Sequence, residues 1–121
     1  MSLDRPVRDF LDAADAVMAT RALNEHREYG GETPERTEHT DAGFGSVRHG
    51  WTGSDGLRRN VVAAYDGTYV IAYHLWDPDA DDRYERVDMS TMPYPPPQEH
   101  LEAMIDRAYQ KANAADESLL A

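Results

Sequence analysis

The centre of the chain carries the feature that most narrows its possible folds, a short turn signal between two runs of β-forming residues. The dipeptide Asp66-Gly67 separates a run ending at Tyr65 from a run beginning at Thr68. An Asp-Gly pair in this setting is typical of a two-residue β-hairpin, and it would place Tyr65 opposite Thr68. The sequence therefore predicts an antiparallel pair of strands as the core of the fold.

Two further turn signals extend this pair into a larger sheet. A turn at 53–56 would pair a strand at 44–52 with the strand that starts at Leu57, and a loop at 77–82 would lead to a more polar strand at 83–89. We therefore predict a four-stranded antiparallel β-meander within residues 43–92.

Helical periodicity flanks this region on both sides. Apolar residues recur at intervals of three and four residues in segment 5–29, after Asp4 as a possible N-cap and with Pro6 in the first turn. The same spacing recurs in segment 98–114. The apolar positions are Val7, Phe10, Leu11, Ala14, Val17 and Met18 in the first segment, and Leu101, Met104, Ile105, Ala108, Tyr109 and Ala112 in the second.

The two connecting segments have different compositions. Residues 30–42 contain no apolar side chain larger than alanine, so we expect an exposed loop, and the four prolines at 93, 95, 96 and 97 predict an extended strap at 93–97. The sequence thus predicts a single domain over residues 1–121 with the order α-β-β-β-β-α. This is an α+β fold with helices on an antiparallel sheet.

The predicted registers sort the strand residues onto two faces, and neither face is plainly polar. One would carry Val47, His49, Trp51, Arg58, Asn60, Val62, Ala64, Tyr69, Ile71, Tyr73 and Leu75, and the other Phe44, Arg48, Arg59, Val61, Ala63, Tyr65, Val70, Ala72, His74 and Trp76. Two interpretations stay open. Either the sheet is covered within the chain, because the helices divide between the two faces or the strap covers the remainder, or one face is an interface. For the second, the candidate interaction surface is Trp51, Arg58, Tyr69 and Tyr73, with a homodimer or another protein as partner.

The charge balance points to the environment of the protein. The chain has 23 acidic and 12 basic residues, a net charge of −11, and only one lysine, Lys111. An Asp-rich, Lys-poor surface keeps a protein hydrated in multimolar salt, so we predict a halophilic source, an archaeon or one of its viruses. The alternative, an acidic surface that mimics nucleic acid or binds a basic partner, predicts clustered acids, whereas these are scattered along the chain.

Motifs that carry chemistry are weak. The chain has no cysteine, its five histidines lack metal-ligand spacing, and no serine lies in a nucleophile motif. Asp77, Asp79 and Asp81 partly follow a calcium-loop spacing, but Asp82 occupies the position that needs glycine. We therefore predict no catalytic residue, no cofactor and no metal, with these three aspartates as the weak candidates for a cation.

Nucleic-acid binding and catalysis remain as alternative functions. Trp51 and Tyr73 beside Arg58 and Arg86 could stack on a single strand, although a net charge of −11 opposes phosphate binding. A small enzyme would need His74, Arg59 and acidic groups to converge in a pocket. With no membrane-length apolar run and no signal peptide, the leading hypothesis is a cytoplasmic or virion-associated, non-enzymatic interaction protein.

Overall fold

The computed structural model describes residues 4–29, 35–41, 43–52, 56–76 and 85–113, and these form two helices and one sheet. The elements follow in the order α1 (Arg5–Tyr29), β1 (Glu35–Asp41), β2 (Phe44–Thr52), β3 (Arg58–Tyr65), β4 (Tyr69–Trp76), β5 (Glu85–Met92) and α2 (Gln98–Asn113). The predicted α+β class, an antiparallel meander between two helices, is confirmed. The sheet has five strands and not the four that the sequence predicted.

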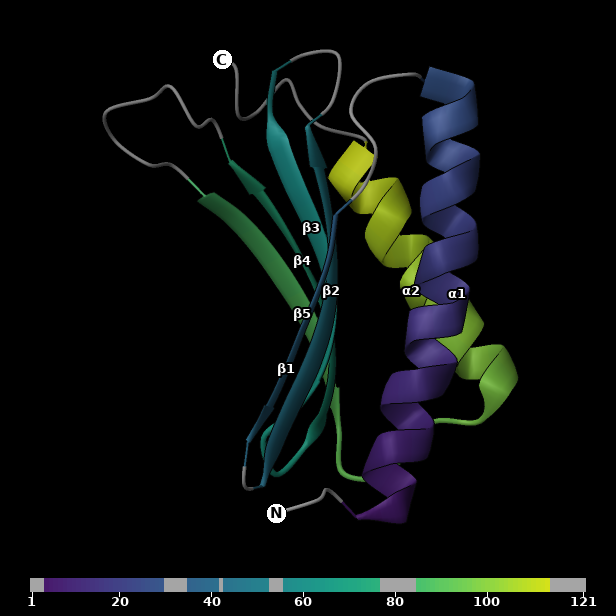
Figure 1. The fold of residues 1–121 in the computed structure, drawn as a ribbon, viewed down its shortest axis with the longest axis vertical. Helices are drawn as coiled ribbons and strands as arrows, with labels where there is room; N and C mark the ends of the chain where they lie inside the picture. Colours follow the sequence, from purple (N-terminus) through teal and green to yellow (C-terminus); the bar gives the residue numbers. More distant parts are fainter. Residues whose placement is uncertain (1–3, 30–34, 42, 53–55, 77–84, 114–121) are drawn as a thin grey trace.

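The molecule has two layers, a sheet and a pair of helices. The strands pair antiparallel in the order β1-β2-β3-β4-β5, and both helices lie against the same side of this sheet (Figure 1). α1 packs on β2 and β3, and α2 packs on β3, β4 and α1. The helices therefore do not divide between the two faces, and no described helix or strand covers the opposite side of the sheet.

The helical faces predicted from periodicity are confirmed. Val7, Phe10, Ala14 and Met18 of α1 are buried, with Leu11 and Val17 partly buried beside them. In α2 the buried residues are Leu101, Ile105, Ala108, Tyr109 and Ala112. Each helix buries the apolar stripe that its spacing of three and four residues creates.

β1 is the strand that the sequence analysis missed, because it lies within the predicted exposed loop 30–42. All seven of its residues are exposed, and none is a large apolar residue. Strand prediction depends on alternating apolar residues, which a polar edge strand does not have. β1 is held instead by backbone pairing with β2 over its whole length, from Glu35 opposite Gly50 to Asp41 opposite Phe44.

The predicted register of β3 is wrong by one residue toward both of its neighbours. Tyr65 pairs with Tyr69 and not with Thr68, and Thr52 pairs with Arg58 and not with Leu57. Each connection is thus one residue longer than predicted. A shift of one residue turns every side chain of a strand to the other face, so β3 presents Arg59, Val61 and Ala63 to the helices.

The central hairpin turn has a local cause for its extra residue. A carboxylate oxygen of Asp66 accepts hydrogen bonds from the Thr68 backbone N–H at 3.4 Å and from its hydroxyl at 3.2 Å. Gly67 adopts a φ of 112°, which side-chain-bearing residues rarely adopt. Asp66, Gly67 and Thr68 together form the loop.

The other predicted boundaries agree with the structure to within three residues. β5 spans Glu85–Met92 where a strand was predicted at 83–89, and α2 ends at Asn113 where 114 was predicted. Residues 93–97 form neither helix nor strand, as the prolines predicted, and the Pro97 carbonyl accepts a 2.9 Å bond from Leu101 N–H in the first turn of α2.

An aromatic cluster around Tyr109 joins the two layers. The Tyr109 ring stacks on Trp51 of β2 with centroids 5.2 Å apart, and its hydroxyl donates a 3.2 Å hydrogen bond to the Met18 carbonyl of α1. The Arg21 guanidinium lies 5.9 Å from the same ring, within cation–π range. Tyr109 therefore connects both helices to the sheet.

Candidate interaction surface

The side of the sheet away from the helices, here called the open face, is the first candidate site in the described residues. Its centre is apolar, with Val62 and Ala64 on β3 beside Val70 and Ala72 on β4. Val62, Ala64 and Val70 are half-buried and Ala72 is buried. The remaining described side chains on β2–β4 are Phe44, Ser46, Arg48, Thr52, Arg58, Asn60 and His74.

Charge on the open face differs from the charge of the whole protein. None of the residues that β2, β3 and β4 contribute to this face is acidic, although the chain as a whole carries −11. Arg48 and Arg58 make this central part cationic. β1, at the edge of the same face, adds Glu35 and Asp41. The open face thus has a basic, apolar centre beside an acidic edge.

A small hollow lies where the basic and acidic parts meet. It has a volume of about 110 Å³ and is lined by Glu35, Thr37, Arg48, Gly50, Arg58 and Asn60. A Cβ atom at position 50 would overlap the carbonyl oxygen of the Asn60 side chain, so a larger residue there would displace the Asn60 amide. Arg58 donates a 3.1 Å hydrogen bond to the Thr52 hydroxyl at the side of the hollow.

The predicted interaction residues lie on two different sides of the sheet. Trp51, Tyr69 and Tyr73 are 9%, 7% and 5% exposed and lie under the helices. There the rings of Tyr69 and Phe10 pack in a T-shaped arrangement with centroids 5.0 Å apart. Burial raises the pKa of Tyr69 above its ordinary value, with the nearby Tyr65 and Asp4 adding to the effect. Only Arg58 lies on the open face. The register error explains this separation, because it placed Arg58 on the same face as the three aromatic residues.

The apolar centre is not recognisable as a patch in the predicted register for the same reason. That register places Val62 and Ala64 with the core residues of β2 and β4, and places Val70 and Ala72 on the other face. The length of each turn was the only signal that could have corrected the parity of β3.

A second polar cluster joins α1 to the β1 edge of the sheet. A carboxylate oxygen of Asp15 lies 2.8 Å from Nε2 of His49, and Arg36 donates from Nε to both Asp15 oxygens at 3.0 Å. Arg36 and His49 are direct cross-strand partners. Burial works against ionisation of Asp15, but hydrogen bonds from Arg36 and His49, with their charges, lower its pKa below the ordinary value.

The role of this Asp15–Arg36–His49 cluster is structural, because it links helix α1 to strands β1 and β2. An Asp–His pair also occurs in catalytic sites, where the imidazole must reach a substrate. Here the His49 side chain is only 6% exposed, so a substrate has little access to the ring. The cluster fastens the polar strand β1, which buries no side chain of its own, to helix α1.

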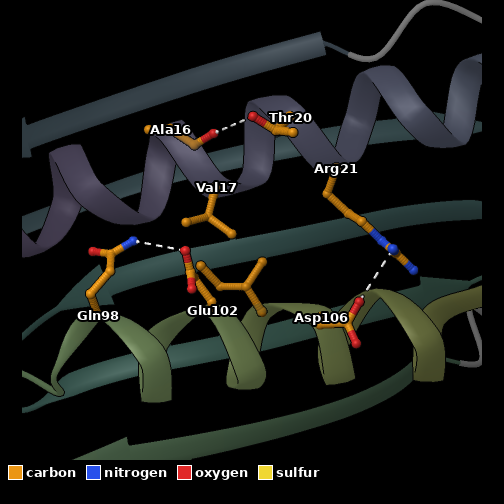
Figure 2. A pocket seen from close by; sticks show the side chains of 8 residues that line it. Ala16, Val17, Thr20, Arg21, Gln98, Glu102 and Asp106 are labelled. Atoms are coloured by element: carbon orange, nitrogen blue, oxygen red, sulfur yellow. Dashed lines mark hydrogen bonds and ion pairs between the residues drawn. The ribbon is translucent and has the colours of Figure 1, made fainter.

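A groove of about 460 Å³ runs between the two helices (Figure 2). Arg21 and Asp106 form a 3.2 Å ion pair across it, and Gln98 donates a 3.4 Å hydrogen bond to Glu102 further along. The Thr20 hydroxyl is bonded to the Ala16 carbonyl at 3.2 Å. Of these contacts, the Arg21–Asp106 ion pair joins the two helices, and the other two each lie within one helix.

The candidate cation ligands Asp77, Asp79 and Asp81 lie outside the described residues, as does the whole of their loop, 77–82. Elsewhere in the described part, no group of three or more His, Asp or Glu side chains is arranged to hold a metal ion. Neither described helix has the length and apolar character needed to cross a membrane.

His49 and His74 lie on opposite faces of the sheet, as predicted. β3 lies between their two strands, and His49 pairs with Val61 whereas His74 pairs with Asn60. Val61 and Asn60 are consecutive residues of β3, so their side chains point to opposite faces.

Comparisons with protein-family models, with curated proteins and with solved structures found no match to this chain.

Proposed function

We propose that the protein is a non-enzymatic interaction protein that works as a homodimer, with the open faces of two copies packed against each other. The observation that carries this proposal is the apolar centre formed by Val62, Ala64, Val70 and Ala72, which no described helix or strand covers. Both helices lie on the other side of the sheet (Figure 1), so this centre has no partner within the described residues. Sheets commonly pack face to face at a separation of ~10 Å.

The size of the open face matches what a stable dimer needs. Five strands of about eight residues, at the usual strand and residue spacings, cover roughly 600 Å² in projection. A standard protein–protein interface buries about 800 Å² of accessible surface on each partner. Accessible surface exceeds the projected area of a pleated face, so one face is large enough.

The distribution of charge on the open face favours a second copy of the same chain as the partner. In a twofold arrangement, each surface patch can meet a different patch of the identical partner, and the contact occurs twice. The basic part formed by Arg48 and Arg58 can thus face the acidic edge formed by Glu35 and Asp41. The hollow beside Gly50 offers space for a partner carboxylate between the two arginines.

The acid-rich composition supports a salt-rich setting for this dimer, the cytoplasm of a halophilic archaeon or a virion of one of its viruses. Copies that each carry −11 repel one another, and multimolar salt screens this repulsion within a few Å. Apolar contacts persist under these conditions. We expect the dimer to be tighter in multimolar KCl than in dilute buffer.

Light scattering coupled to size exclusion tests the dimer directly. In multimolar KCl, the mass should be twice the chain mass of 13.6 kDa at micromolar concentrations. Val62→Glu places a charge at the apolar centre and should give a monomer. Ala103→Glu is the matched control because it adds the same charge at an exposed position of α2; it should stay dimeric.

Circular dichroism should show that each variant is folded, and Arg48→Glu, at an exposed position, provides a second disruption if Val62→Glu unfolds the chain. A wild-type monomer at all concentrations would overturn the proposal and favour docking on a larger partner. A dimer that survives both open-face variants would place the contact elsewhere.

A further inference from the structure

A cavity on the helix side of the sheet is separate from the open face. It has a volume of about 270 Å³ and lies between α2 and the last two strands, with Ile71, Ala72 and Tyr73 of β4, residues 90–92 of β5, and one side of α2 as its walls. The cavity exists because α2 packs on β3 and β4. The edge strand β5 therefore extends beyond the cover of the helix.

The ionisable side chains that α2 contributes to this cavity are all basic. They are His100, Arg107 and Lys111, at positions seven and four residues apart, which places them on one side of the helix. Lys111 is the only lysine of the chain. Among the described residues that line the cavity there is no aspartate or glutamate, although acids outnumber bases almost two to one in the sequence.

The other walls provide hydroxyl and apolar groups. Ser90 and Tyr73 are the hydroxyl-bearing residues on the helix side, and Ser90 lies directly opposite Ile71 in the sheet. Met92, Met104 and Ala108 contribute apolar surface. Small-molecule sites combine such apolar walls with a few polar groups that orient the ligand.

We propose that this cavity binds a small organic anion, a carboxylate or a phosphate monoester with a short apolar body. The anionic group lies among the basic side chains of α2, and the apolar body packs against the methionines. A guanidinium such as Arg107 binds carboxylate and phosphate through paired hydrogen bonds, and such charge-assisted bonds are stronger than neutral ones. The volume is just below the usual range for ligand pockets, ~300–1,000 Å³, which limits the ligand to a small metabolite.

Titration with three probes of similar shape tests this site in the full chain. Phenyl phosphate and benzoate carry the two anionic groups, and phenol is the neutral control; all are added at one fixed KCl concentration. Binding is followed by ¹H–¹⁵N NMR, with shifts expected at residues 71–73, 90–92 and 100–111. Phenyl phosphate or benzoate should saturate these shifts, and the tighter of the two identifies the anionic group that the cavity prefers.

Two matched substitutions separate a site from general attraction to positive charge. Arg107→Gln, at an exposed position of the cavity wall, should raise Kd at least about tenfold, equivalent to ~1.4 kcal/mol. Arg8→Gln removes the same charge from an exposed position of α1 outside the cavity and should leave Kd within about twofold, because Coulomb attraction across solvent is weak.

Three results would overturn the proposal: shifts that do not saturate with either anion, phenol binding as tightly as the anions, or equal effects of Arg107→Gln and Arg8→Gln. Because Arg107 is exposed, its replacement should not unfold the chain, and His100→Gln, at another exposed position, gives an independent second variant. The outcome is independent of the proposed dimer, since the cavity lies on the other side of the sheet.

Discussion

Replacing Arg59 by methionine should destabilise the protein far more than the same replacement at its neighbour Arg58. Arg59 is 4% exposed and extends from β3 to the end of α2, where its Nε donates a 2.8 Å hydrogen bond to the Ala112 carbonyl. A second donor of the same guanidinium bonds the Leu57 carbonyl at 3.1 Å. Carbonyls in the last turn of a helix have no partner within the helix, and a cation there also stabilises the helix dipole.

The expected magnitude follows from these contacts. A hydrogen bond from a charged group contributes about 1.5–3 kcal/mol net. Replacement by methionine relieves part of the cost of burying the charge and keeps an apolar side chain of similar length, so we expect a loss of roughly 2–4 kcal/mol for Arg59→Met. Arg58 is half-buried and makes a bond to the Thr52 hydroxyl, so Arg58→Met should cost less than about 1 kcal/mol.

Urea unfolding followed by the fluorescence of the tryptophans measures both losses. The two variants should be compared at several protein concentrations, because dimerisation makes apparent stability depend on concentration and Arg58 lies on the proposed dimer surface. Equal losses would refute our account of Arg59. A larger loss of stability for Arg58→Met than for Arg59→Met would support the register that the turn signals predicted, in which Arg58 lies under the helices.

Two further predictions test the central turn and the cluster that holds β1. Gly67→Val should cost about 1–3 kcal/mol, the usual cost of strained backbone, because Gly67 has a φ of 112°; a neutral result in thermal unfolding would show that the turn is built differently. Asp15 has a pKa lowered by Arg36 and His49 despite partial burial, so its stabilising effect is present above about pH 4 and is lost as pH falls through its folded pKa. Asp15→Asn should therefore be less stable than the wild type near neutral pH and converge with it in acid, and an equal difference at all pH values would contradict this assignment.

The sequence alone determined the elements whose signals are local. Apolar spacing identified the buried faces of both helices, down to Phe10 and Ile105, because a helix repeats within a few residues and needs no distant partner to define its inner face. The prolines at 93–97 predicted the break before α2 for the same reason. Local signals also identified four of the five strands and the α+β class.

The tertiary structure decided everything that depends on pairing between distant segments. β1 is polar along its whole length, so only its pairing with β2 and the contact of Arg36 with Asp15 show that it is a strand. The face of β3 depends on whether each turn has one residue more or fewer, because side chains alternate along a strand with a period of two. Because of that one-residue difference, Arg59 and not Arg58 lies in the core, and Val62 lies on the same face as Val70 in the apolar centre. The position of both helices on one side, so that no described helix or strand covers the open face, is likewise set by packing between elements and has no signature in any single segment of the chain.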